Sequence, residues 1–170
     1  TGQVEEYTGS TWRSVGQAIL TTHAALGDAH ALGGNIVLLP FDYSAIGAGT
    51  WGIVPSASYM PGVVASNSSG AANLDNLSWQ VYLPAGTYTL VAIVHKDSNE
   101  PIIDIDLDGT EIATFDLYNA TTSNNIRVTK TCIVVAATGL KTLKLRVDGR
   151  HASSVGWTAV FSCITLWRTA

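Results

Sequence analysis

Apolar and polar residues alternate along most of the chain from Asn35 onward, and Gly, Pro, Asn or Asp interrupts the alternation every few residues. Side chains with period two point to opposite faces of a β-strand, so each stretch predicts a strand with one face in the core. The predicted strands cover residues 35–40, 50–54, 77–83, 87–95, 102–108, 111–118, 125–129, 132–137, 141–147 and 156–167. Since no helical pattern separates them, the sequence predicts an all-β, antiparallel sandwich or barrel.

The stretch "IIDIDLDGTEIATFDLY", residues 102–118, begins like the calcium-binding loop of an EF-hand. An EF-hand needs a bidentate Glu at its twelfth position, and counting from Asp104 that position is Phe115. The stretch instead alternates two sets, with Ile103, Ile105 and Leu107 on one face and Asp104, Asp106 and Asp108 on the other. It therefore predicts a hairpin that turns at Asp108-Gly109 and exposes its acids to solvent. A calcium ion held weakly at the strand edge is the alternative.

The first 34 residues follow a different pattern. Apolar positions spaced by three and four predict a short helix that begins after a cap at Ser10 or Thr11 and stops at "LGG", residues 32–34. The positions are Trp12, Val15, Ile19, Thr22, Leu26 and Ala29. We therefore expect an N-terminal helical neck or linker over residues 1–34 and one β-sandwich domain over residues 35–170.

The composition narrows the classes of partner. Charged residues make up 13% of the 170 residues, the net charge is −4, and the chain contains no run of Lys and Arg. Such a surface does not favour nucleic acid or anionic membranes. The longest apolar runs are too short to cross a bilayer, so we expect no membrane insertion.

Two cysteines lie far apart in the sequence, each inside an alternating apolar stretch. Cys132 is in "TKTCIVVAA" and Cys163 is in "AVFSCITLW". Two buried thiols in neighbouring strands fit this pattern better than a disulfide, although a disulfide remains the alternative. A zinc site would need further ligands nearby.

The cassette formed by "VYLPAGTYTLVAIVH", "IIDIDLDGTEIATFDLY", "TGLKTLKLRVDG" and "FSCITLW" covers about residues 77–167. It resembles the jelly-roll sandwiches of carbohydrate-binding modules and their galactose-binding-like relatives. The resemblance implies a jelly-roll topology and a sugar ligand. Such modules often carry acidic calcium ligands near the first strand, but in "NIVLLPFDYSAIG" the only acid is Asp42. The resemblance therefore does not imply a bound structural ion, and we expect no cofactor.

The segment "THAALGDAHALGG", which leads through two glycines into the β-domain, is similar to the necks of phage tail fibres and other trimeric virion appendages. This resemblance implies a homotrimer. His23 and His30 lie seven residues apart on one predicted helical face. In a threefold bundle they would form rings of imidazoles able to hold a divalent metal, and solvated neck histidines are the alternative.

A sugar site needs an exposed aromatic plane beside amide, carboxylate or guanidinium groups that fix hydroxyls. Residues in predicted loops or at strand ends meet this need: Trp51, Tyr59, Trp157, Asp97, Asn99, Arg150 and His151. Tyr59 is the strongest candidate, because it lies in the long loop-like stretch 55–76, where core packing does not require an aromatic ring. Trp79 and Trp167 lie in alternating runs and are predicted to be core residues.

Catalytic signatures are weak. The chain has no G-x-S-x-G elbow, and His95 and His151 are predicted at exposed strand ends without a partnering nucleophile. Glu100 and the acids of residues 104–108 could supply two carboxylates for glycoside hydrolysis, but acids on an exposed strand lack the apolar pocket that raises one pKa. We expect a protein that is not an enzyme.

The sequence thus predicts a non-catalytic structural or receptor-recognition domain of an extracellular or virion appendage, such as a tail fibre, knob or decoration protein. Its partners would be copies of itself, other appendage proteins, or glycans on a cell surface. The alternative is a carbohydrate-binding module cut from a secreted glycoside-active enzyme.

Overall fold

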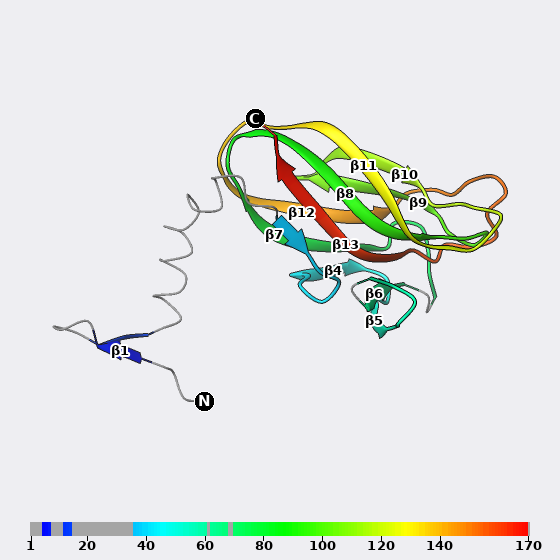
Figure 1. Ribbon diagram of the computed structural model, residues 1–170, viewed down its shortest axis with the longest axis horizontal. Coiled ribbons are helices and arrows are strands. Elements are labelled where there is room, and N and C mark those ends of the chain that lie inside the picture. The colour runs from blue at the N-terminus through cyan, green and yellow to red at the C-terminus, as the bar shows by residue number, and fades with distance from the viewer. Residues whose placement is uncertain (1–4, 8–11, 15–35, 61, 68–69, 170) are drawn as a thin grey trace. The chain divides into compact units, whose positions relative to one another are not determined.

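The computed structural model describes residues 5–7, 12–14, 36–60, 62–67 and 70–169 (Figure 1). The chain divides into two compact units, Thr1–Gly34 and Asn35–Ala170. In the first unit, β1 (Glu5–Tyr7) pairs antiparallel with β2 (Trp12–Ser14). The predicted helix was wrong at its start, since Trp12–Ser14 form a strand. The rest of that prediction, with His23 and His30, lies outside the described residues.

The second unit consists of two antiparallel sheets, which confirms the predicted β-sandwich. The five-stranded sheet has the order β10-β9-β12-β7-β4. The six-stranded sheet has the order β11-β8-β13-β6-β5, and β3 also pairs with β13. The strands are β3 (Ile36–Leu38), β4 (Ala45–Ala48), β5 (Gly52–Pro55), β6 (Val63–Ser66), β7 (Asn76–Leu83), β8 (Gly86–Lys96), β9 (Ile102–Leu107), β10 (Thr110–Asp116), β11 (Ser123–Val135), β12 (Gly139–Val147) and β13 (Val160–Arg168).

The core lies between the two sheets. Alternate residues of both sheets fill it, including Leu143 and Leu145 of β12 and Leu90 of β8. Trp79 packs edge-on against Phe161 at 5.7 Å between ring centroids, so its predicted core position is confirmed. Removing either ring would cost about 3–5 kcal/mol of stability, because each fills its space between the sheets. Trp167 is 37% exposed, so its predicted core position was wrong.

Strand positions follow the prediction in β7, β8, β9, β10 and β12, while β13 begins at Val160 where residue 156 was predicted, and two strands nearer the start were not predicted. The sequence did not indicate β4 or β6. The four residues of β4, "AIGA", are all exposed and show no alternation. β6 lies within the stretch interpreted as a long loop, where it pairs antiparallel with β5. The predicted single long loop over residues 55–76 was therefore wrong, because β6 divides it.

β9 and β10 form the predicted hairpin. Asp108 and Gly109 have φ angles of 50° and 81°, the positive values that this two-residue turn requires. The prediction for the acidic face was only partly right. Asp108 is exposed, whereas Asp104 and Asp106 are 2% and 6% exposed. They are covered because Arg146 of β12 binds both carboxylates.

Both cysteines are free. Cys163 is half-buried, but Cys132 is exposed, so the prediction of two buried thiols was wrong for Cys132. Cys132 lies where the register of β11 against β8 shifts, and its φ angle is 60°. The sequence therefore showed two strands, 125–129 and 132–137, where the structure has one strand with a bulge.

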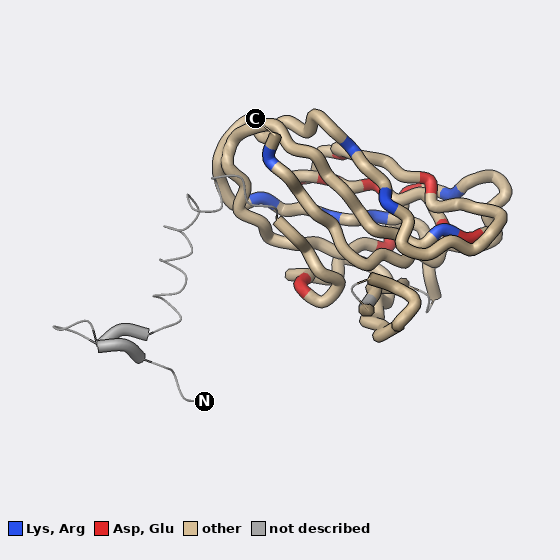
Figure 2. Tube along the Cα trace, in the orientation of Figure 1, with Lys and Arg blue, Asp and Glu red and all other residues tan. Residues whose placement is uncertain are grey.

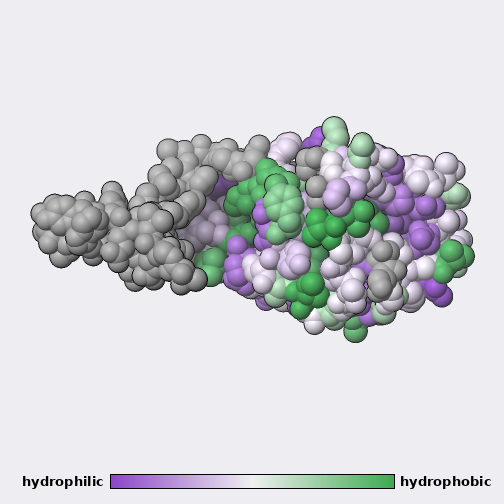
Figure 3. All heavy atoms as spheres, turned by 90° about the horizontal axis from the view of Figure 1, so that it is seen from below, coloured by the Kyte–Doolittle hydropathy of each residue, from purple (hydrophilic) through white to green (hydrophobic). Residues whose placement is uncertain are grey.

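The surface of the sandwich carries few charges. Lys, Arg, Asp and Glu residues are spread thinly over its strands and loops (Figure 2). Exposed apolar residues gather on the side that carries β4, β5 and β6 (Figure 3), among them Ile46, Ile53 and Met60. Within the described ranges, no helix has the length and hydrophobicity needed to cross a membrane.

Candidate functional site: a loop cluster at one end of the sandwich

Three connections gather at one end of the sandwich, on the right in Figure 1, and a fourth, the β5–β6 turn, is drawn below them and reaches the same group through Tyr59 and Met60. The four connections are the β5–β6 turn (56–60 and 62) and the loops β8–β9 (97–101), β10–β11 (117–122) and β12–β13 (148–159). Strand pairing places them together: Lys96 at the end of β8 lies opposite Ser123 at the start of β11, and Val147 at the end of β12 lies opposite Ile103 of β9. We call these four connections the loop cluster.

Backbone hydrogen bonds join three of these loops. The amide of Asn119 donates to the carbonyl of Asp97 at 3.1 Å, and the amide of Val155 donates to the carbonyl of Ser98 at 3.0 Å. The fourth connection is held through β11, because Asn125 accepts a hydrogen bond from the Met60 amide at 2.8 Å. The loops therefore form one continuous surface built on a rigid frame.

Asp97 lies at the centre of this network. Its Oδ1 accepts from the Ser98 amide and hydroxyl, and its Oδ2 accepts from the Thr122 hydroxyl at 2.9 Å. The backbone hydrogen bond from Ser98 is the main reason why the pKa of Asp97 is lowered. The carboxylate thus stays ionised, and one of its lone pairs remains for a further donor such as a sugar hydroxyl.

Aromatic rings lie beside the polar groups. Tyr118 stacks on His151 with ring centroids 4.3 Å apart and an angle of 8° between the planes. The guanidinium of Arg150 lies 5.0 Å from the ring centroid of Trp157. Tyr118, His151 and Trp157 are half-buried, and Arg150 is exposed. A half-buried aromatic ring can pack on the protein with one side and contact a ligand with the other.

Tyr59 joins the cluster from the β5–β6 turn. Its ring meets the ring of His95 edge-on at 5.9 Å. His95 is 8% exposed and binds the buried Glu100 at 2.7 Å between Nδ1 and Oε1, so the prediction of an exposed His95 was wrong. Burial raises the pKa of Glu100 to about 7, and the hydrogen bond that His95 donates to Glu100 raises the pKa of His95.

A buried amide fixes the position of Trp157. Asn67 is fully buried, and its Nδ2 donates to Asp75 at 3.0 Å and to the Trp157 carbonyl at 3.3 Å. Its Oδ1 accepts from the amide of Ala159 at 2.6 Å. These bonds satisfy the polar groups of the buried amide and hold the β12–β13 loop against β6.

The structure brings six of the seven sequence-predicted sugar-site residues into the loop cluster: Tyr59, Asp97, Asn99, Arg150, His151 and Trp157. Trp51 does not belong to it. Trp51 is 6% exposed and packs edge-on against Phe161, so its ring is part of the core and offers no face to a ligand. Within the described ranges, the side chains of Asn99 and Arg150 make no hydrogen bond, which leaves their donors available.

Sequence reasoning missed Tyr118, His95 and Glu100 as members of the cluster. Tyr118 ends the alternating run "EIATFDLY", so it was assigned to a strand. His95 and Glu100 flank a loop, and only their burial in the fold shows that they form a pair. One signal for this pair was present in the sequence: Glu100 follows His95 by five residues, across a predicted turn.

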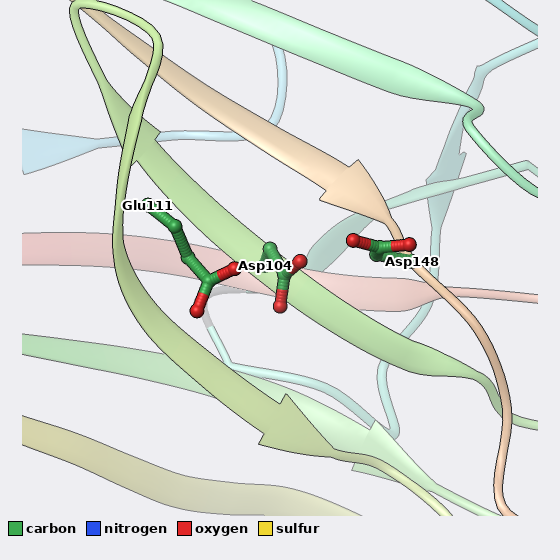
Figure 4. A group of neighbouring side chains, drawn as sticks. All are labelled: Asp104, Glu111 and Asp148. Carbon is green, nitrogen blue, oxygen red and sulfur yellow. The ribbon is translucent and has the colours of Figure 1, made fainter.

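A second group of polar side chains lies outside the loop cluster. One carboxylate oxygen each of Asp104, Glu111 and Asp148 lies within 4.8 Å of the others (Figure 4). Burial raises the pKa of Asp104 to about 6, and the hydrogen bond from Arg146 lowers the pKa of Asp148. Among the described residues, this carboxylate cluster is the group whose donor atoms suit a hard metal ion.

Comparison with known proteins supports the fold. No family model and no curated protein matches the sequence. Among solved structures, the CBM36-1 domain of a multidomain xylanase from the hindgut metagenome of Trinervitermes trinervoides has a TM-score of 0.60 at 16% identity, covering 78% of this chain and 95% of that one.

Two further structures have a TM-score of 0.56. One is the carbohydrate-binding module CBM36 in complex with calcium and xylotriose, at 20% identity over 77% of this chain and 98% of that one. The other is the C-terminal CBM6 of a marine laminarinase from Zobellia galactanivorans, at 15% identity over 79% of this chain and 99% of that one.

These structural neighbours are carbohydrate-binding modules, and their likeness to this chain establishes the β-sandwich fold. None of the three is a tail fibre or another virion protein, so the appendage resemblance gains no support from them.

Proposed function

We propose that the chain is a non-catalytic carbohydrate-binding module and that the loop cluster is its sugar site. The observation that carries the proposal is the gathering of Trp157, Tyr118 and Tyr59 with Asp97, Asn99 and Arg150 at one end of the sandwich. The fold of the neighbouring modules supports it. This proposal corresponds to the alternative reached from the sequence and replaces the virion appendage as the main interpretation.

Each group has a defined task in this proposal. The faces of Trp157 and Tyr118 pack against the apolar C–H face of a pyranose ring. The carboxylate of Asp97 accepts hydrogen bonds from hydroxyls, while the guanidinium of Arg150 and the amide of Asn99 donate them. A site that offers both hydrogen-bond donors and acceptors beside flat apolar rings favours a sugar over a purely apolar ligand.

The module would serve a secreted enzyme or another extracellular protein that acts on polysaccharide. A binding site formed by loop side chains that accept and donate hydrogen bonds beside aromatic rings can retain a sugar chain, and the neighbouring modules support a role in binding. We therefore assign recognition to this chain and leave catalysis to another domain or protein.

The test is binding to soluble polysaccharides by affinity electrophoresis and calorimetry, with xylan, laminarin, mannan and cellulose oligosaccharides as probes. Trp157→Ala and Tyr118→Ala should each weaken binding about tenfold or more, which corresponds to about 1.4 kcal/mol. Tyr82→Ala is the matched control, because Tyr82 is an exposed aromatic residue of β7 outside the loop cluster.

If Trp157→Ala, Tyr118→Ala and Tyr82→Ala lose affinity for polysaccharide equally, the sugar site does not lie in the loop cluster. Failure of the folded wild-type protein to bind any of these polysaccharides at millimolar sugar would refute the proposal.

The homotrimer remains a separate proposal that rests on residues 1–34. Apolar residues exposed on the side of β4 and β5, such as Ile46 and Val54, would be partly covered by association. Solution mass by light scattering, with and without residues 1–34, tests it. A monomer in both cases at high concentration would exclude the trimer.

A further inference from the structure

The loop cluster contains a buried ion pair to which the proposed sugar site gives no direct task. Glu100 is 1% exposed and His95 is 8% exposed, and Nδ1 of His95 lies 2.7 Å from Oε1 of Glu100. Burying charged groups is costly, because they lose their hydration. Apolar side chains of similar size would fill this space without that cost, so stability alone does not account for the pair.

His95 supports the ring of Tyr59. The two rings meet edge-on, with their centroids 5.9 Å apart and an angle of 74° between their planes. Tyr59 is half-buried, so part of its ring packs on the protein and part is exposed. Since Tyr59 comes from the β5–β6 turn and His95 from β8, this contact holds Tyr59 in place relative to the other loops.

Glu100 joins the β8–β9 loop to the β12–β13 loop. Its carbonyl accepts a hydrogen bond from the hydroxyl of the buried Ser154 at 2.8 Å, and its amide donates to the Asp97 carbonyl at 3.3 Å. The two loops also approach closely at Gly156, where an added Cβ would lie 2.9 Å from the carbonyl oxygen of Asn99. A movement of Glu100 would therefore displace both loops.

A second carboxylate lies near the pair. The charge of Asp97 acts on both His95 and Glu100, and the charges of Asp97 and Glu100 both act on Tyr59. One imidazole thus faces two carboxylates that belong to the same short loop. Protonated His95 offsets their repulsion, because its positive charge lies beside both.

The neighbouring elements present uncharged groups to the pair. β8 lies between β11 and β13 (Figure 1), and the backbone amide of Val160 in β13 donates a hydrogen bond to Glu100. Residues 117–126, which form the β10–β11 loop and the start of β11, contain no Asp, Glu, Lys, Arg or His. Lys96 follows His95 on the opposite face of β8. In the β12–β13 loop, Arg150 and His151 contact aromatic rings of the sugar site.

The pair exchanges a proton in the neutral pH range. Burial raises the pKa of Glu100 from 4.5 to about 7, and the hydrogen bond to Glu100 raises the pKa of His95 above 6.5. Asp97 is already ionised there, because the backbone hydrogen bond from Ser98 lowers its pKa. Neutral His95 beside ionised Glu100 therefore leaves two carboxylates that repel each other without a cation between them.

We propose that the His95–Glu100 pair positions Tyr59 and the β8–β9 loop for sugar binding, and that loss of a proton from the pair at alkaline pH weakens that binding. This inference rests on the proposed sugar site. His95 and Glu100 are positioning residues, because both are buried and act on the sugar through Tyr59 and Asp97. Coupling between two sites is reciprocal, so a bound sugar makes the pair hold its proton more tightly.

The test uses the full chain and whichever of xylan, laminarin, mannan and cellulose oligosaccharides the wild type binds. Calorimetry should give an affinity about fivefold lower at about pH 8 than at about pH 6, which is a typical coupling between two sites. At about pH 7.5, the binding enthalpies in phosphate and in Tris should differ, because the proton that the pair takes up comes from the buffer.

Glu100→Gln should bind about equally at the two pH values, because the amide does not ionise. Glu111→Gln is the matched control: Glu111 is an exposed residue of β10 outside the loop cluster, so this variant should keep the difference of about fivefold. His151→Gln tests the other histidine of the cluster. It should bind more weakly at both pH values and keep their ratio. Circular dichroism checks the fold of each variant.

A wild-type affinity that stays constant or rises from about pH 6 to about pH 8 overturns this inference and leaves the sugar site in place. A pH dependence that persists in Glu100→Gln also overturns it, and its loss in His151→Gln would then assign the titration to His151. If Glu100→Gln does not fold, equal binding enthalpies in phosphate and Tris decide against the coupling. If the wild type binds none of the polysaccharides at either pH, the proposed function fails and this inference fails with it.

Discussion

At the scale of single residues, the buried pair His95–Glu100 makes stability depend on pH. Glu100 has its pKa raised from 4.5 to about 7, mainly by burial, and His95 has its pKa raised above 6.5 by its hydrogen bond to Glu100. Both shifts mean that the folded state holds protons that the unfolded state releases. Their stabilising effect is complete below the unfolded pKa and is lost as pH rises through the folded pKa.

We predict that the urea midpoint of the protein falls between pH 5 and pH 8. Asp104, with its pKa raised to about 6, acts in the same direction. Glu100→Gln should make this fall smaller, because it removes one of the groups with a raised pKa, whereas Asp42→Asn should leave it unchanged. A midpoint that stays constant or rises across this interval would contradict the assignment.

Carboxyl groups with lowered pKa do not obscure this test. Asp97, Asp108 and Asp148 have pKa values below their usual 3.8. Their contribution to stability is present above that value and is lost only as the pH falls below it. Acid unfolding therefore reports on these three groups, and the neutral range reports on the raised ones.

Residue burial was the part of the site that the sequence could not show. Alternation placed Asp104 and Asp106 on the outer face correctly, but it could not show that the long side chain of Arg146 would cover them. Similarly, Trp51 and Trp157 had equivalent surroundings in sequence, and only the fold separates the core ring from the loop ring. Exposure is set by residues that lie next to each other in space and far apart in the chain.

At the scale of elements, β11 combines a long strand with a residue in a left-handed conformation. Cys132 adopts a φ angle of 60° where the register shifts between Lys130 and Ile133. A side chain with a Cβ atom is strained in this region, and Gly is not. The bulge explains why the alternation appeared to break at residues 130–131.

We predict that Cys132→Gly raises the free energy of unfolding by about 0.5–1 kcal/mol, because it relieves the strain at this position. Thr131→Gly, at the neighbouring exposed position, should lower it by about the same amount, since Gly gains more entropy on unfolding. Urea unfolding measures both. If the two variants change stability in the same direction, the strain at Cys132 is not significant.

Strands could be predicted from the sequence wherever one face of the strand is buried in the core and the other is exposed to solvent. β7, β8, β9, β10 and β12 meet that condition at most positions, and their predicted ranges agree with the structure within two residues at each end. β4 is exposed at every residue, so it has no apolar alternation to detect. β6 is short and joined to β5 by a turn, and its surroundings of Gly, Pro and Ser suggested a loop.

At the scale of the whole molecule, the second unit contains its own core. Among the residues that the structure describes, the buried core formed between the two sheets is made of residues from Leu38 to Leu166. A sandwich of this size buries enough apolar surface to fold alone. We therefore expect the sheets to fold without the first unit.

We predict that a protein consisting of residues 35–170 folds cooperatively, with a melting temperature within about 4 °C of the full chain, which corresponds to less than about 1 kcal/mol. Calorimetry of the two proteins is the measurement. A molten or insoluble product would show that residues 1–34 contribute to the stability of the sandwich.

The direction of the chain through the sandwich has a practical consequence. Ile36 lies opposite Leu166, and Thr169 donates a hydrogen bond to the Thr87 carbonyl at 2.7 Å, so the chain enters and leaves the sheets at the end remote from residues 97–101 and 148–159. A fluorescent reporter fused after Thr169, or a biotin placed there for immobilisation on a sensor, should leave the opposite tip accessible. Because the fused group would lie at the other end of the sandwich, a large polysaccharide could still reach residues 97–101 and 148–159.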